Sequence, residues 1–229
     1  MNLGRITTAA LLCAGLASAS FAALSSTFTD WAKGPVQYIM TPQESAVWKQ
    51  LASDDQAQQF VDLFWAKRDP TPSTPQNEFR EDFEARVKYA DDHFKQGRTR
   101  GAMTDLGKVF IVLGPPSQPV QKNRPDMSLG GNIDQSRGSG TTVQSATPDL
   151  SRQIWVYDDT RSPELKKIDM RAAEFDFTDQ YGNGQWTIEH GKTDVKSTLE
   201  HVALANIVSP TLTSVPSFDQ RRPASQPPE

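Results

Sequence analysis

The chain has 229 residues, of which 23% are charged and 9% aromatic, and a net charge of −4, a composition typical of one modest globular domain with flexible ends. The acidic balance, without a cluster of Lys and Arg interleaved with aromatic residues, excludes recognition of nucleic acid by charge. Cys13 is the single cysteine and lies in a segment that we expect to be removed. Disulfides, thiolate catalysis and thiolate metal sites are therefore excluded from the mature chain.

Residues 1–22 (MNLGRITTAALLCAGLASASFA) have the pattern of a secretory signal peptide. Arg5 is the only charge, an apolar run follows, and small residues end the segment. We expect cleavage after Ala19 or Ala22, and hence a secreted or periplasmic protein. The alternative is an uncleaved membrane anchor, which we disfavour because the apolar run is shorter than the ~20 residues that a spanning helix needs.

Three helices are predicted in the first half of the chain. Residues 41–44 (TPQE) and 53–56 (SDDQ) have capping-box character, and each precedes an apolar pattern at helical spacing, with Val47, Trp48 and Leu51 as the first apolar face. The prolines in residues 69–72 (DPTP) end the second helix, since a residue before proline is disfavoured in the α region. We predict that the third helix starts at Thr74-Pro75. Its apolar stripe consists of Phe79, Phe83, Val87, Ala90 and Phe94.

Strands are predicted in the second half. Residues 108–113 (KVFIVL) form an apolar, β-branched run between glycines, which favours a buried strand. Residues 154–157, 173–177 and 185–189 are predicted as further strands, the last two joined by a type I′ turn at Asn183-Gly184. A final helix is expected over residues 194–206, with Asp194 as its cap.

Residues 117–150 contain no aromatic side chain and are rich in Gly, Ser, Thr, Gln and Pro. Such a segment buries too little apolar surface to offset its chain entropy, so we expect a disordered insertion. The proline-rich residues 207–229 are expected to be a flexible tail. The predicted fold is therefore an α+β domain over residues 28–206, with N-terminal helices followed by a small, mostly antiparallel sheet.

The sequence gives little support for a metal, nucleotide or serine-hydrolase site. The histidines at 93, 190 and 201 are not in HExxH or HxH spacing, and no GxSxG, P-loop or GxGxxG motif is present. We therefore expect no metal and no cofactor. Glu78 and Asp82 lie one helical turn apart, but a solvated helix face that is paired with nearby arginines is the preferred interpretation. On that face, Arg80 is expected to pair with Glu84, and Asp82 with Arg86.

The polar residues around the prolines, together with two beyond them, are predicted to form a structural or binding clasp instead of a catalytic loop. Arg68 is expected to pair with Glu78 or Asp105, so that Arg68→Ala or Glu78→Ala would lower the melting temperature. The candidate residues are Arg68, Asp69, Asn77, Glu78, Arg80, Arg86, Thr104 and Asp105.

Three stretches resemble the bacterial GWxTD domain family: GPVQYIMTPQESAVWKQL, FVDLFWAKRDPTPSTPQNEFREDFEARVKYADDHF and GAMTDLGKVFIVLGPP. The resemblance is close from about residue 31 to 116 and weaker to about residue 190. One departure is Ala102, which stands where the family motif has tryptophan. Gly101, Thr104 and Asp105 are retained, which suggests that the turn geometry survives. The resemblance implies an exported bacterial protein without an established activity.

The favoured hypothesis is an exported binding or scaffolding module of the bacterial cell envelope or surface, whose partner is a protein or an envelope polymer. The alternative is a carboxylate-dependent hydrolase of an envelope polymer, with Glu78, Asp82 or Asp105 as acid and base. No catalytic residue is assigned, because no His, Cys or Ser constellation is recognisable.

Overall fold

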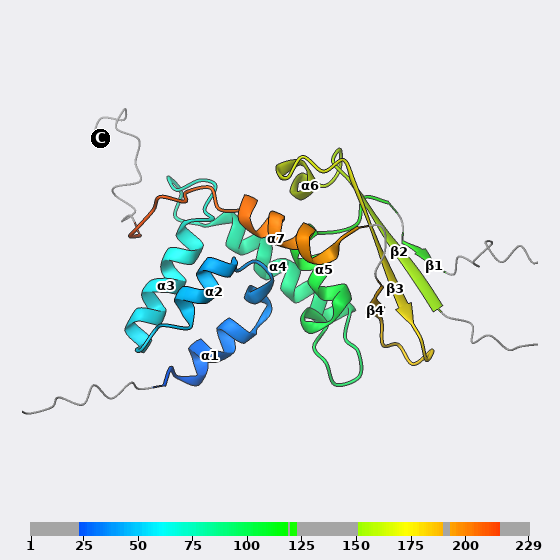
Figure 1. Cartoon of the computed structure of the whole chain (residues 1–229), viewed down its shortest axis with the longest axis horizontal. Helices are drawn as coiled ribbons and strands as arrows, with labels where there is room; N and C mark the ends of the chain where they lie inside the picture. Colours follow the sequence, from blue (N-terminus) through cyan, green and yellow to red (C-terminus); the bar gives the residue numbers. More distant parts are fainter. Residues whose placement is uncertain (1–22, 119, 123–150, 190–192, 216–229) are drawn as a thin grey trace, which may run out of the picture.

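The computed structural model describes residues 23–118, 120–122, 151–189 and 193–215 (Figure 1). The predicted signal segment and most of the predicted insertion lie outside these ranges. Helices come first and a small sheet follows, which confirms the predicted α+β class. The helical elements are α1 (Ser26–Lys33), η1 (Pro35–Tyr38), α2 (Pro42–Trp48), α3 (Asp54–Ala66), α4 (Glu78–His93), η2 (Gly101–Met103), α5 (Asp105–Leu113), α6 (Pro163–Lys167) and α7 (Val195–Ala205). The strands are β1 (Gln121–Lys122), β2 (Ser151–Asp158), β3 (Ala172–Asp179) and β4 (Thr187–Ile188).

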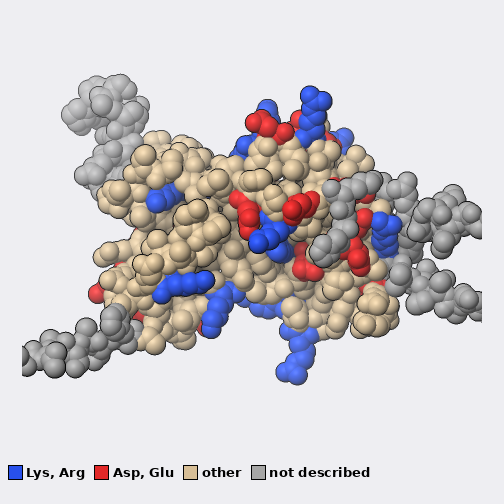
Figure 2. Space-filling view, in the orientation of Figure 1, with Lys and Arg blue, Asp and Glu red and all other residues tan. Residues whose placement is uncertain are grey.

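Helix α5 lies between the N-terminal helices and the sheet (Figure 1). It contacts α4, η1, η2, α6, α7 and β4. Seven of its nine residues are buried. On the outside of the molecule, charged side chains gather over α7 near the middle of the face shown in Figure 2, whereas the surface over α2 and α3 is mostly uncharged.

The strand predicted over residues 108–113 is wrong, because these residues form the greater part of α5. A short run of apolar residues fits a buried strand and a buried helix equally well, since both are apolar on every side. Thr104 determines the outcome locally. Its hydroxyl accepts from the Gly107 N–H at 3.1 Å and donates to the Gly101 carbonyl at 2.8 Å, which makes it the N-cap of a helix.

Both capping predictions for the first helices are confirmed. Thr41 and Glu44 form a reciprocal capping box at the start of α2, and the Ser53 hydroxyl caps α3. The apolar face predicted for α2 is only partly right. Trp48 packs in a cluster of aromatic rings, whereas Val47 is half exposed.

Helix α4 begins later than predicted. Asn77, not Thr74-Pro75, is the N-cap, and its side-chain oxygen accepts from the Arg80 N–H at 2.9 Å. The prolines therefore belong entirely to the connector between α3 and α4. The predicted apolar stripe is confirmed, since every member lies in the core or packs against it: Phe79, Phe83, Val87, Ala90 and Phe94.

The sheet has the strand order β1-β2-β3-β4 and is antiparallel throughout. This confirms the prediction of a small, mostly antiparallel sheet. The loop before β4 is not the type I′ turn expected at Asn183-Gly184. That turn needs positive φ at both central residues, and Asn183 does not have it, whereas Gly182 (φ 62°) and Gly184 (φ 80°) do. The Asp179 carboxylate holds the loop by accepting the N–H groups of Asn183 and Gly184 at 3.1 and 2.7 Å.

Two segments that were expected to be loose begin with fixed residues. Ser117 is buried, and its N–H donates to the Val156 carbonyl at 2.9 Å. At the other end of the domain, the N–H groups of Val208 and Ser209 both donate to the Lys67 carbonyl at 3.0 Å. The residues that follow α7 therefore anchor to the end of α3.

Helices α4 and α5 meet through two glycines, Gly101 of η2 and Gly107 of α5. A Cβ at Gly101 would lie 1.8 Å from the Ala90 carbonyl oxygen, and a Cβ at Gly107 would lie 2.0 Å from the Gly101 carbonyl oxygen. Neither contact is possible for a real methyl group. Glycine is therefore required at both positions by the close approach of two backbones.

We expect Gly101→Ala to lower the free energy of unfolding by at least about 3 kcal/mol, at or beyond the upper end of the usual overpacking range, because backbone on both sides must shift. Urea unfolding measures the effect. Gly182→Asn is the matched control, since its side chain meets open space and asparagine tolerates positive φ. Equal stability of the two variants would show that η2 does not constrain the packing of α4 on α5.

Candidate functional site

Arg68, at the C-terminal end of α3, has a fully buried side chain. Its Nη1 donates to Glu44 Oε1 at 2.8 Å and to the Phe64 carbonyl at 3.1 Å, and its Nη2 donates to Glu44 Oε2 at 2.7 Å and to the Ile39 carbonyl at 2.9 Å. The guanidinium carbon lies 3.7 Å from the centre of the Phe64 ring. This bidentate pair joins α2, α3 and the turn after η1 at one point.

The expected partner of Arg68 was wrong, because Glu44 takes the place foreseen for Glu78 or Asp105. Burial alone would raise the pKa of the Glu44 carboxyl, but the Arg68 guanidinium and the hydrogen bonds from Thr41 together lower it below its ordinary value. Glu44 therefore serves two purposes at once. It completes the cap of α2 and neutralises a cation that has no access to water.

The connector between α3 and α4 is fixed by Asn77 and Asp69. The Asn77 amide nitrogen donates to the Trp65 carbonyl at 2.8 Å, while its oxygen caps α4. Asp69 is buried, and its carboxylate accepts from the Thr71 N–H at 3.0 Å. Because Asn77 contacts both helices, the end of α3 and the start of α4 are held together across the prolines.

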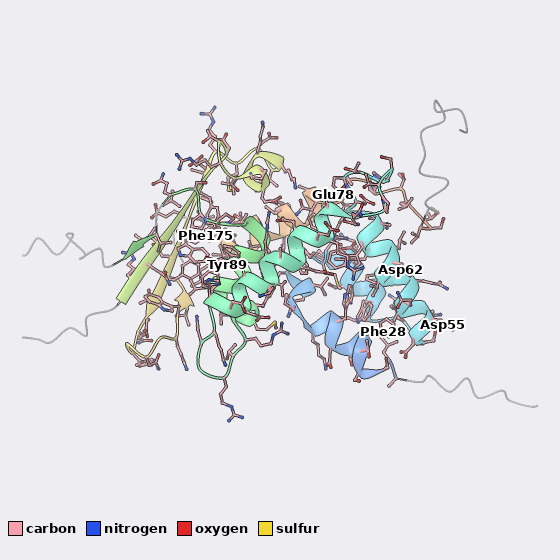
Figure 3. All side chains as sticks on the ribbon, turned by 180° about the vertical axis from the view of Figure 1, so that it is seen from behind. Phe28, Asp55, Asp62, Glu78, Tyr89 and Phe175 are labelled. Atoms are coloured by element: carbon pink, nitrogen blue, oxygen red, sulfur yellow. The ribbon has the colours of Figure 1, made fainter. Side chains whose placement is uncertain are left out.

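Two other candidates are exposed. Glu78 accepts from the Thr74 hydroxyl at 3.0 Å. Arg80 pairs with Glu84 at 2.7 Å, as predicted for that spacing, and lies 5.4 Å above the Trp65 ring. Figure 3 shows Glu78 at one end of α4 and Tyr89 toward the other.

Arg86 organises the other end of the core. Its Nη1 donates to the carbonyls of Ile111 and Val112 at 3.3 Å, in the last turn of α5. Its Nη2 contacts Asp82 at 2.7 Å, as predicted, and Glu164 at 3.2 Å. Since the last carbonyls of a helix have no partner within it, Arg86 caps α5 from a neighbouring helix.

The ion pair continues from Glu164 to the last helix. Lys167 bonds the second Glu164 oxygen at 2.8 Å and the Asn206 side chain at 2.7 Å. The buried Tyr157 hydroxyl also donates to the Gly114 carbonyl just beyond α5, at 3.0 Å. Burial raises the pKa of Tyr157 well above its ordinary value, so the hydroxyl stays a donor.

Thr104 and Asp105 lie at the opposite end of α5. Asp105 Oδ2 accepts from the Ile188 N–H at 3.0 Å, which joins the start of α5 to β4. Nearby, Asp91 accepts from the Ala102 N–H at 2.9 Å and pairs with Arg100. Burial raises the pKa of Asp91, but Arg100 and the Ala102 N–H outweigh it and bring the pKa below its ordinary value.

The eight candidates therefore do not form one site. Arg68, Asp69 and Asn77 surround the connector, Arg86 lies at the C-terminal end of α5, and Thr104 and Asp105 lie at its start. Three carboxylates in these networks were missed by sequence reasoning: Glu44, Glu164 and Asp91.

The described part of the chain contains no group of three or more His, Cys, Asp or Glu side chains that could hold a metal ion. Within the same ranges, no helix combines the length and the apolar character required to cross a membrane.

Arg68→Ala should lower the free energy of unfolding by about 3–5 kcal/mol, because it leaves Glu44 partly buried and unpaired. Glu78→Ala should cost less than about 1 kcal/mol, since the side chain is exposed in the first turn of α4. This small cost for Glu78→Ala replaces the clear drop in melting temperature that the sequence predicted for it. Thermal and urea unfolding of both variants decide the matter, and a larger loss for Glu78→Ala would contradict the assignment of the clasp to Arg68 and Glu44.

The clasp should also weaken in acid. Since the pKa of Glu44 is lower in the folded chain than its ordinary value of 4.5, its contribution is complete above that value and disappears as the pH falls through the folded pKa. The difference in stability between wild type and Glu44→Gln should therefore shrink on acidification. Urea unfolding of both proteins across this pH range measures the difference. The contributions of all other carboxylates are common to both proteins and cancel. A constant difference would show that the charge of Glu44 is not responsible.

Comparison with known proteins gives one family. The family model of the GWxTD domain matches residues 17–128, which include the connector, η2 and α5. No curated protein and no solved structure matches the chain. The match includes the close resemblance over residues 31–116 and extends beyond it at both ends, but it ends before the weaker resemblance that continues to about residue 190. Residues 17–128 are therefore similar to the GWxTD domain family.

Proposed function

We propose that this protein is an exported binding or scaffolding module of the bacterial cell envelope or surface. The observation that carries the proposal is how the fold engages the polar residues that the sequence singles out. Arg68, Asn77, Arg86 and Thr104 all complete internal caps and ion pairs. Side chains that are engaged in this way supply rigidity, which favours a scaffold over a reactive centre.

The three carboxylates of the hydrolase alternative do not converge. Glu78 begins α4, whereas Asp105 follows η2, which packs against Ala90 near the other end of that helix. The twelve residues from Glu78 to Ala90 span about 18 Å at 1.5 Å per residue. Paired acids in glycosidases lie roughly 5–9.5 Å apart. Glu78 and Asp105 are therefore unsuited to act as such a pair.

Asp82 does have a carboxylate neighbour, but an arginine lies between them. Asp82 and Glu164 both contact Nη2 of Arg86. One guanidinium thus engages both carboxylates, whereas the two acids of a glycosidase must face the substrate between them. This arrangement supports a structural ion pair over an acid and base.

Open apolar surface supports a binding role. A cavity of about 470 Å³ lies between α1, α3 and α4 and is lined by Phe28, Trp31, Val61 and Val87, among others. Another of about 520 Å³ includes Tyr89, which is 44% exposed. Pockets of this size and composition accept the anchoring side chains of partners. The signal pattern of residues 1–22 supports export.

The proposal predicts that the chain isolated from its host begins at Ser20 or Ala23 and sediments with purified envelope fractions without releasing soluble fragments. Intact mass and analysis of the supernatant measure both. The triple variant Glu78→Gln, Asp82→Asn, Asp105→Asn should sediment equally well, because none of its side chains is needed for an exposed apolar contact. Soluble fragments that disappear with the triple variant would establish the hydrolase. If the protein associates with no envelope fraction, the proposal of a binding module is wrong.

A further inference from the structure

A groove lies where α7 crosses the start of α2 and the middle of α5. We call it the α7 groove. Its volume is about 380 Å³, within the usual range for small-molecule sites. It lies on the part of the surface where charged side chains gather over α7 (Figure 2). Its lining consists of Gln37, Tyr38, Met40, Thr41, Pro42, Ser45, Lys108, Lys196, Leu199, Glu200 and Ala203.

Lys108 is the unusual member of this lining. It is the only charged residue of α5 after Asp105, on a helix that is otherwise buried. Its side chain is partly buried, and its ammonium lies 5.9 Å from the centre of the Tyr38 ring. Among the described residues it forms no ion pair with a carboxylate. Its one described side-chain interaction is this contact with the Tyr38 ring, which leaves the ammonium group available to a ligand anion in the groove.

Lys196 supplies a second cation from α7. Its side chain is 84% exposed and is only loosely associated with Glu200, at 3.9 Å. Such a lysine is free to bend toward a ligand, because little is lost when a weak surface pair breaks. Two cations thus face one carboxylate around the groove, which leaves a net positive charge.

The lining also includes apolar side chains, beside the polar Gln37, Thr41 and Ser45. Leu199 and Ala203 are buried on the inner side of α7, and Met40 packs against the core from the opposite wall. Methionine adapts its shape to irregular apolar groups. The groove therefore combines a cationic rim with an apolar floor.

We propose that the α7 groove binds a small organic anion with an apolar body, of the class of medium-chain carboxylates. The carboxylate contacts Lys108 and Lys196, and the apolar body lies against Met40, Leu199 and Ala203. A purely inorganic anion would leave the floor uncovered, and a neutral apolar molecule would leave Lys108 without a counter-ion. This site is separate from the envelope partner proposed above and does not depend on it.

Two sources share this chemistry: a fatty acid, and the C-terminal carboxylate of a peptide that ends in an apolar residue. The test is NMR titration of the ¹⁵N-labelled mature chain with octanoate and with N-acetyl-leucine, and the tighter ligand identifies the source. Acetate, inorganic phosphate and octanol separate the contributions of charge and apolar surface. We expect binding with a Kd on the order of 1 mM or tighter for one of the first two, and at least about tenfold weaker binding for the other three.

The shifts should fall on residues 37–45 and 195–203. Lys108→Gln should weaken binding about tenfold, as loss of a single ionic contact would. The control Lys88→Gln removes an exposed lysine of α4, which pairs with Asp92, and should leave affinity unchanged. Lys196→Gln is a second test at an exposed position that folding does not require.

Three results would overturn the proposal. They are binding of octanol as tight as that of octanoate, affinity that is the same in both groove variants and in wild type, and shifts confined to residues outside the groove. Retained envelope association in Lys108→Gln would show that the anion site and the proposed envelope association are independent of each other.

Discussion

The rest of the structure depends on one constraint: a short, almost wholly buried helix must have both its ends satisfied inside the protein. Helix α5 has seven buried residues of nine, so water cannot complete its terminal hydrogen bonds. Thr104 caps the start, and Arg86 reaches the last carbonyls from α4. That arginine in turn needs a counter-charge, which Glu164 provides from α6. The ion pairs around α5 are thus consequences of burying a helix.

The same logic explains the proline connector. A buried arginine, Arg68, lies just after the end of α3. Because water does not reach it, its charge must be neutralised by a carboxylate of the chain, and Glu44 provides this carboxylate while it caps α2. Prolines restrict the unfolded connector, and Asn77 then bonds both helices that the connector joins. Removing one partner leaves an uncompensated charge, which is why such pairs are costly to break even where their net contribution is small.

Local rules predicted the elements whose signals are local. The caps at Thr41, Ser53 and Asp194 and the i,i+4 pairs of α4 follow from spacing alone, and the structure contains all of them. Residues 108–113 were misassigned because an apolar run has the same pattern in a buried strand and in a buried helix. The partner of Arg68 was missed for a different reason. The capping box already explains Glu44, and nothing in the spacing shows that its carboxylate also pairs with a residue 24 positions away.

The polar residues of this fold divide into structural and functional ones. A polar residue whose hydrogen bonds are all made within the domain, as at Asn77 or Thr104, is accounted for by packing. Lys108 is different, because it lies on the helix that imposes the main constraint, yet no described carboxylate neutralises it. A binding site for a ligand is expected at such a residue, because the fold does not neutralise its charge. The proposed anion site in the α7 groove therefore follows from a charge that the fold leaves unpaired, whereas most of the candidate residues singled out in the sequence are those that the fold itself requires.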